Sequence, residues 1–227
     1  MTGRPRGGVT EPEPPQIVPD DDLGRTEAIR LLRSGGIVAL PTDTVYGLAV
    51  DLASPGGIDR LFAAKRRPND RAVVLLLANA DQAARLVDWP ASAAALAGAF
   101  WPGGLTIIVA QRPDAALPPE LTGGRQTVGL RLPDHSSPRA LAAALGPLPV
   151  TSANVSGLAE ASNPMEIRDQ LGEAIDLILD GGPARGGPSS TVVDCSTPTP
   201  RILRDGAIGA DEIRDTLVGA GLPEPGR

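Results

Sequence analysis

The sequence predicts one α/β domain with a large twisted mixed sheet flanked by helices. Helical and strand-like stretches alternate along the chain, which is the pattern of such a fold. Residues 73–77 (VVLLL) form a continuous apolar run, as in a central strand that is covered on both faces. Polar loops rich in Gly and Pro fall between the elements, at 41–47, 65–72, 101–104, 152–163 and 181–190. Because such loops gather at strand ends, we expect them to surround one central open cleft.

The individual elements are predicted from apolar spacing and from the residues that end each run. Ile29, Leu31 and Leu32 recur at helical spacing in residues 24–34, and two glycines then end the helix. Residues 37–40 form a short buried strand that ends at Pro41. Further helices are predicted at 57–65, 79–87, 91–100, 137–145, 164–172 and 210–218. Further strands are predicted at 73–77, 105–110, 127–132, 148–151, 175–179, 191–195 and 201–203.

The two ends of the chain differ from the middle in composition. Residues 1–22 are rich in Pro and contain five acidic residues against two arginines, which predicts a disordered tail. Residues 219–227 (GAGLPEPGR) predict a second flexible tail. The folded domain is therefore expected at residues 23–218.

Charge and composition exclude several classes of protein. The net charge of −6, from 21 basic and 27 acidic residues, argues against a protein that mainly grips duplex nucleic acid, but allows a local basic pocket. One Cys and one His exclude an internal disulfide and a Cys/His zinc site. The chain has no 18-residue apolar run and no signal-peptide pattern, so we expect a cytoplasmic protein without a membrane association.

The ratio of arginine to lysine is unusual, because 20 of the 21 basic residues are Arg and Lys65 is the single lysine. A genomic bias towards Arg codons explains the ratio, and Lys65 could then be a chance survivor. The alternative is that position 65 needs a compact ammonium in place of a planar guanidinium.

Two loops contain polar groups that suit a small charged substrate. Residues 41–48 (PTDTVYGL) place two hydroxyls, a carboxylate and the single Tyr directly after a buried strand, as in a ligand loop or in a turn bonded to its own backbone. Residues 65–71 (KRRPNDR) hold four cations, which suit a polyphosphate. Favourable charge at a helix C-terminus is the alternative, but it does not explain why the single lysine falls there.

Two more loops are small and polar. Residues 151–157 (TSANVSG) would let a ligand approach the backbone closely, although a hydrogen-bonded turn explains them as well. Residues 181–191 are Gly-rich but precede a strand, so they are not a Walker A loop, and any ATP site is unconventional. We interpret His135 as a capping residue, Trp101 as a packing anchor and Cys195 as a buried thiol.

Seven segments, taken together and in order, resemble the YrdC-like threonylcarbamoyl-AMP synthases. They are PTDTVYGL (41–48), KRRP (65–68), FWPGGLT (100–106), TVGLRLPDH (127–135), TSANVSG (151–157), DGG with SSTVVD (180–182 and 189–194) and ILRDGAI (202–208). The resemblance covers roughly residues 24–218 and implies the short, single-domain form of a YrdC-like fold, with 23–218 as the catalytic domain.

The resemblance implies an L-threonylcarbamoyladenylate synthase, a nucleotidyltransferase that makes threonylcarbamoyl-AMP and pyrophosphate from L-threonine, bicarbonate and ATP with Mg²⁺. It also implies that the product passes to the tRNA threonylcarbamoyl transferase complex for t6A37 modification, with at most weak tRNA contact. The L-threonine contacts would be Thr44, Arg131 and Ser190. The ATP contacts would be Lys65, Arg67, Arg71, Thr127, Ser152, Asn154, Glu160 and Arg204, with Lys65 and Arg67 catalytic and no metal ligand from the protein.

The sequence departs from the family pattern at four positions. Arg71 replaces a frequent Asn, Ala72 a frequent Pro or Gly, and Thr151 a frequent Pro. Leu76 stands where many members have a His near the threonine, so no such His acts in this chain.

The sequence leaves three alternatives open. One is an RNA-binding module of the same fold, which the acidic balance disfavours. A second is an ATP-binding regulatory module without turnover. The third is carbamoyl-phosphate chemistry, as in hydrogenase-maturation proteins that contain a similar domain but are much longer.

Overall fold

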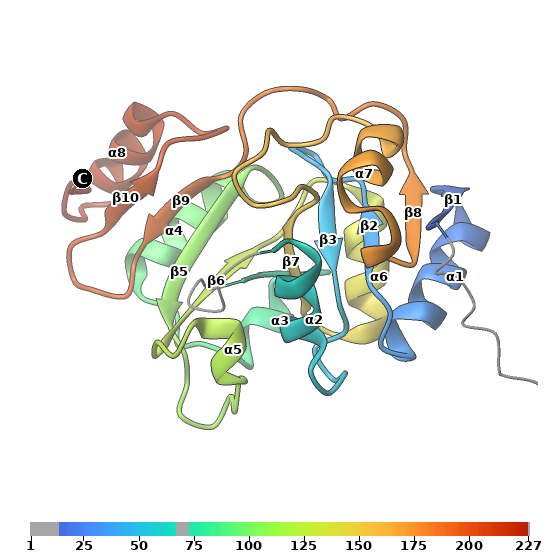
Figure 1. Ribbon diagram of the computed structural model, residues 1–227. Helices are drawn as coiled ribbons and strands as arrows, with labels where there is room; N and C mark the ends of the chain where they lie inside the picture. Colours follow the sequence, from blue (N-terminus) through green and yellow to red (C-terminus); the bar gives the residue numbers. More distant parts are fainter. Residues whose placement is uncertain (1–13, 67–72, 227) are drawn as a thin grey trace, which may run out of the picture.

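A ten-stranded mixed sheet runs through the part of the chain that the computed structural model describes, residues 14–66 and 73–226 (Figure 1). The strands are β1 (Gln16–Pro19), β2 (Val38–Leu40), β3 (Gly47–Ala49), β4 (Val74–Leu76), β5 (Leu105–Ala110), β6 (Thr127–Arg131), β7 (Leu148–Ser152), β8 (Leu177–Asp180), β9 (Thr191–Asp194) and β10 (Arg201–Arg204). Their order in the sheet is β1-β8-β2-β3-β7-β4-β6-β5-β9-β10, with parallel and antiparallel neighbours. The predicted fold class is thus confirmed.

Helices flank this sheet. They are α1 (Asp22–Arg33), α2 (Gly57–Ala64), α3 (Asp81–Ala84), α4 (Ala91–Phe100), α5 (Pro119–Thr122), α6 (Ser136–Leu145), α7 (Pro164–Leu171), the 3₁₀ turn η1 (Gly172–Ala174) and α8 (Ala210–Gly219). Most predicted helices are correct to within one or two residues. The helix predicted at 79–87 shrinks to α3, because the chain turns at its end and Val87 forms a bridge with Gln111. No helix of the described ranges is long and apolar enough to cross a membrane.

The structure corrects both predicted tails. Residues 16–19 form β1, which pairs in parallel with β8, and Ile17 of this strand packs against the main core. The tail predicted at 1–22 is therefore wrong for these residues, while 1–13 lie outside the described part. At the other end, Leu222 packs against the core and Gly226 pairs with Arg201, so these residues are not a flexible tail. Both segments are flanked by prolines, which favoured the prediction of a disordered or flexible tail over strand pairing.

Two further elements escaped prediction because they are short. β3 falls inside the loop expected at 41–48, and its three residues are fully buried between β2 and β7. α5 is a single turn in a Pro-rich connection that precedes β6.

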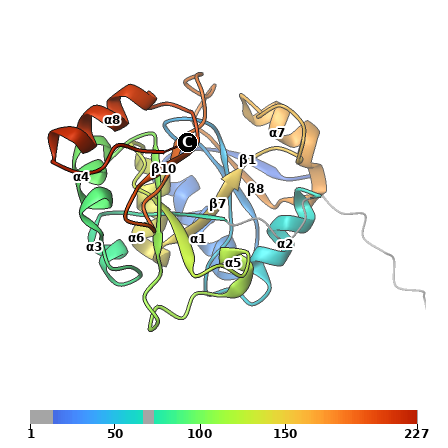
Figure 2. The ribbon, with the colours of Figure 1, turned by 90° about the vertical axis from the view of Figure 1, so that its left-hand side faces the viewer.

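The core consists of two apolar clusters, one on each face of the sheet. On one face, α1 and α6 pack against β2, β4, β7 and β8, with Leu32 and Leu141 fully buried. The larger cluster lies under α2, α4, α7 and α8, and Ile58, Leu61 and Phe62 point inward as predicted. Figure 2 shows α4 and α8 side by side at one end of the molecule and α2 and α7 at the other. The sheet edge between these helix groups remains available for a site.

Sheet twist explains how β8 and β9 connect. The pairings make the two strands formally parallel, with β2, β3, β7, β4, β6 and β5 between them. Adjacent strands rotate by roughly 20–25°, so seven steps accumulate roughly 140–175°. The start of β9 therefore returns to the edge where β8 ends, and residues 181–190 join the two across that edge (Figure 1).

Candidate substrate-binding cleft

A cleft of about 500 Å³ opens where the loops after β2 and β7 meet the segment between β8 and β9. It confirms the predicted central cleft. Most of the predicted site residues line it together: Thr44, Lys65, Arg131, Ser152, Asn154, Glu160, Ser190 and Arg204.

Three predicted site residues do not appear among these lining residues. Thr127 begins β6, where it pairs with Ala110 of β5, and it lies outside the cleft lining. Arg67 and Arg71 lie outside the described residues. The predicted roles of all three stay predictions.

One end of the cleft is built around Arg131, the last residue of β6. Its side chain is only 7% exposed. Nη2 donates to Asp43 Oδ1 at 2.7 Å, Nη1 to Thr44 Oγ1 at 2.9 Å, and Nε to the Gly103 carbonyl at 3.0 Å. Burial lowers the pKa of Arg131, and the Asp43 carboxylate opposes that effect. Because a guanidinium stays protonated in proteins, a fixed cation stands at this end.

A hydroxyl cluster adjoins Arg131 across the sheet. Ser190 Oγ lies 2.8 Å from Thr106 Oγ1, and both side chains are buried. Arg204 Nη2 donates to the Ser190 carbonyl at 2.7 Å and to its Oγ at 3.0 Å. Arg204 is close enough to contribute to the lowered pKa of Arg131. Two guanidiniums and several hydroxyls therefore share this end, which suits a carboxylate or another small anion.

The other end of the cleft is organised by Lys65, the residue that ends α2. Its side chain is 2% exposed. Nζ donates to the Ser152 carbonyl, to the Asn154 carbonyl at 2.6 Å and to Asn154 Oδ1 at 3.2 Å. The Lys65 carbonyl in turn accepts from the Ser156 amide at 3.0 Å. The ammonium thus sets the conformation of loop 152–156 and brings positive charge beneath it.

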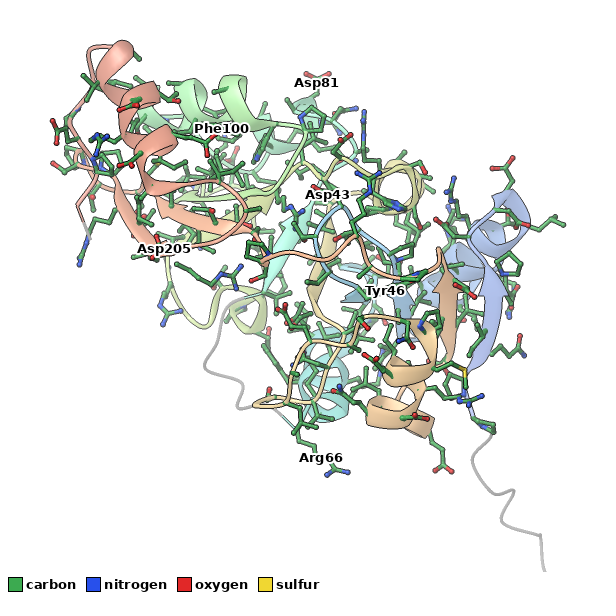
Figure 3. All side chains as sticks on the ribbon, turned by 90° about the horizontal axis from the view of Figure 1, so that it is seen from above. Asp43, Tyr46, Arg66, Asp81, Phe100 and Asp205 are labelled. Atoms are coloured by element: carbon green, nitrogen blue, oxygen red, sulfur yellow. The ribbon has the colours of Figure 1, made fainter. Side chains whose placement is uncertain are left out.

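Tyr46 links several loops of the cleft. Its hydroxyl donates to the Gly182 carbonyl at 2.6 Å and accepts from the Gly181 amide at 3.1 Å. Its own carbonyl accepts from the Ala153 amide at 2.8 Å. The ring is 1% exposed, and burial raises the pKa of Tyr46 to about 12. Figure 3 shows Asp43 and Tyr46 near the centre of the molecule, away from Asp81 and Arg66 at its periphery.

Three residues that shape the site were not predicted as site residues: Tyr46 and Thr106, which line the cleft, and Asp43, which lies beside it. Asp43 was expected either to belong to a ligand loop or to bond its own backbone, and in the structure it pairs with Arg131. Thr106 and Tyr46 had no assigned role, although both belong to the segments that carry the family resemblance. Their place in the resembling segments was the only signal that the sequence offered for these residues. It does not indicate which residues they contact.

The three residues interpreted as structural are confirmed in that role. His135 caps α6, because its Nδ1 accepts from the Ser137 amide at 3.1 Å. Trp101 Nε1 donates to the Leu105 carbonyl at 2.8 Å, and its ring meets Trp89 edge to face. Burial raises the pKa of the Cys195 thiol to about 11.

The fold and the cleft define an α/β protein with one polar, cation-lined substrate cleft at a sheet edge. The family model of Sua5, YciO and YrdC, described as "Telomere recombination", matches residues 30–206. This chain belongs to that family, as the resemblance predicted.

Known proteins agree with this assignment. The chain is 38% identical over 193 residues to the threonylcarbamoyl-AMP synthase of Bacillus subtilis (strain 168), and this covers 84% of the chain but 56% of that protein. It is 36% identical over 185 residues to the threonylcarbamoyl-AMP synthase of Vibrio vulnificus (strain YJ016), covering 79% of the chain and 97% of that protein.

A solved structure agrees as well. The crystal structure of P. abyssi Sua5 complexed with L-threonine has a TM-score of 0.83 and 31% identity, covering 92% of this chain and 61% of that one. The chain therefore spans between half and two thirds of the length of the B. subtilis and P. abyssi relatives.

Proposed function

We propose that this chain is an L-threonylcarbamoyladenylate synthase that converts L-threonine, bicarbonate and ATP into threonylcarbamoyl-AMP and pyrophosphate. The observation that carries the proposal is the two-ended cleft, in which Arg131 and Lys65 sit in separate polar settings within one cavity. Relatives named for this activity, and a relative solved with L-threonine, support the same choice.

The Arg131 end is proposed to bind L-threonine. A guanidinium fits a carboxylate through two parallel hydrogen bonds, and Asp43 and Gly103 already hold the Arg131 fork in one orientation. Thr44 and Ser190 offer hydroxyls beside it. These groups would align the amino acid so that its amine faces the rest of the cleft.

The Lys65 end is proposed to bind the phosphates of ATP. Ser152 and Asn154 stand on the loop that Lys65 holds. Arg204, which lies beside Ser190 towards the Arg131 end, is a further proposed ATP contact. Arg67, Arg71, Thr127 and Glu160 remain proposed ATP contacts on the resemblance. Mg²⁺ would enter bound to the triphosphate and would neutralise part of its charge.

The chemistry needs positioning more than a protein nucleophile. The threonine amine and bicarbonate give a carbamate and water. A carbamate oxygen then attacks the α-phosphorus of ATP, and the bond to pyrophosphate breaks. Negative charge grows on the phosphoryl oxygens in the transition state, where preorganised cations stabilise it. Lys65, Arg67 and Arg204 are the proposed stabilisers, and the product would pass to the tRNA threonylcarbamoyl transferase complex in the cytoplasm.

A pyrophosphate-release assay tests the proposal. ATP, Mg²⁺, bicarbonate and L-threonine are supplied together and then omitted one at a time, and release is expected only with the full set. The variant Arg131→Gln should abolish release. Arg112→Gln is the matched control, since Arg112 forms an exposed ion pair with Asp114 away from the cleft. Release that is independent of threonine would contradict the proposal, and tight, salt-sensitive tRNA binding without release would favour an RNA-binding module.

A further inference from the structure

The segment 181–190, here called the strap, has an unusual course. It leaves β8, second in the sheet, and enters β9, ninth in the sheet, so that it passes the edges of six strands. The cleft opens at this same edge, and Ser189 and Ser190 at the end of the strap line it. Figure 1 shows the connection from β8 arching over the top of the sheet to β9.

The C-terminal end of the strap is firmly attached. The Ser189 carbonyl accepts from the Ala207 amide at 3.0 Å, and Ser190 is held by Arg204 and Thr106. A Cβ on Gly206 would come within 2.3 Å of the Ser189 carbonyl oxygen, so the backbones are in close contact. These contacts fix the strap at the Arg131 end of the cleft without involving Tyr46.

The N-terminal end of the strap packs with Gly181 against Pro41 and with Ala184 against the main core, and a few hydrogen bonds hold its backbone. The Tyr46 hydroxyl bonds to both Gly181 and Gly182, as given above. Asp180 Oδ1 accepts from the Gly182 amide at 2.8 Å, and the Ser162 carbonyl accepts from the Ala184 amide at 2.7 Å. Tyr46 is the one side chain from another element of the described chain that hydrogen-bonds this end.

Between its two ends, the strap forms few contacts with the rest of the described chain. Residues 185–188 are exposed, and no hydrogen bond joins them to the rest of the described chain. Gly186 and Gly187 have φ values of +75° and +111°, a backbone conformation that glycine adopts without strain. A glycine pair between two anchored ends is a natural hinge.

We propose that Tyr46 is a positioning residue that latches the N-terminal half of the strap across the cleft, with Gly186-Gly187 as the hinge. Release of the latch would let residues 181–184 swing away while Ser189 and Ser190 stay in place. Threonine would enter through this opening, and closure would keep water from the carbamate. This use of the latch rests on the proposed function, whereas the latch itself rests on the contacts alone.

Hydrogen exchange of individual backbone amides tests the latch in the free protein. Tyr46→Phe removes the phenolic oxygen and keeps the ring. The Gly181 amide loses its acceptor in this variant and should exchange about tenfold faster. The Ala184 amide is the decisive probe, because its acceptor is Ser162 and not Tyr46. A latch predicts that Ala184 also exchanges several-fold faster, while a local structural role predicts no change there.

Two further variants control the experiment. Thr122→Val removes another buried hydroxyl that donates to a carbonyl, in α5 and outside the cleft lining, and should leave strap exchange unchanged. Asp180→Ala removes the exposed side-chain acceptor of the Gly182 amide and should loosen the strap in the same direction. If Tyr46→Phe fails to fold, Asp180→Ala decides the result. Unchanged Ala184 exchange in a folded variant would overturn the latch.

Kinetics then connect the latch to the reaction. Tyr46→Phe should raise KM for L-threonine several-fold with little change in KM for ATP. Equal KM values in wild type and variant would overturn this role of the latch. A wild-type protein that releases no pyrophosphate would contradict the proposed function, but the exchange result would still stand.

Discussion

The two ends of the cleft place a buried cation in opposite kinds of setting. At one end, Arg131 is paired with the carboxylate of Asp43, and both side chains are 7% exposed. At the other end, Lys65 donates to the backbone and side-chain oxygens of Ser152 and Asn154. The hydrogen bonds of Arg131 come from two loops far apart in sequence, while those of Lys65 within the described residues converge on a single loop.

This difference indicates what each cation does for the structure. The Asp43 carboxylate balances the charge of Arg131 and fixes the direction of its fork, which favours selective binding of one carboxylate. Lys65 fixes a loop, so its removal should disturb the backbone that would surround the phosphates. The ends should therefore respond differently to mutation.

The largest effect is expected for Arg131→Met. The variant leaves the Asp43 carboxylate buried without its cation, and breaking a buried ion pair costs about 3–5 kcal/mol of unfolding free energy. Urea unfolding, followed by the fluorescence of Trp89 and Trp101, measures this loss. The double variant Arg131→Met with Asp43→Asn should recover much of the stability but no pyrophosphate release. Full stability in the single variant would show that the pair is not a structural unit.

Lys65→Met should have the next largest effect on stability. The variant keeps the length of the side chain but removes charged hydrogen bonds, each of which contributes about 1.5–3 kcal/mol. The same urea titration should therefore show a loss of about 2 kcal/mol, together with loss of pyrophosphate release. Hydrogen exchange should rise at the Ser156 amide, since loop 152–156 loses its anchor. Normal exchange and normal activity would remove Lys65 from both roles.

Two serine variants compare the ends directly. Ser190→Ala should raise KM for L-threonine, and Ser152→Ala should raise KM for ATP, each by about 2–10-fold, which corresponds to one hydrogen bond. Each variant should leave the KM of the other substrate nearly unchanged. Steady-state pyrophosphate release at varied substrate concentrations gives all four values. Equal shifts for both substrates in both variants would mean that the cleft has no separate ends.

The smallest effect is expected at His135, which caps α6 beside the Arg131 end. Burial lowers the pKa of His135 below its usual 6.5. Arg185 and Arg25 act in the same direction, whereas Asp20 and Asp43 oppose it. The neutral ring is the capping form, so its stabilisation is fully present above pH 6.5 and is lost as the pH falls.

His135→Asn provides the control, because Asn caps helices without titrating. The difference in unfolding free energy between wild type and this variant should change by about 1 kcal/mol as the pH is lowered from neutral, the usual worth of a cap. A difference that does not vary with pH would mean that His135 titrates equally in the folded and unfolded protein.

The sequence alone determined the elements and the family. Apolar spacing predicted most strands and helices. A helix or strand that packs on a core repeats its buried apolar residues at a fixed spacing, and this spacing can be read from the local sequence. The scarcity of lysine singled out Lys65, and the ordered segments identified the family.

Only the tertiary structure decided which side chains meet. Asp43 and Arg131 are 88 residues apart in sequence, and Tyr46 and Gly182 are 136 apart. No local period encodes such pairs, because they arise from strand order and from twist accumulated over the whole sheet. Strand β1 was not predicted for the same reason: its short, Pro-flanked run forms a strand only because it pairs with the edge of β8.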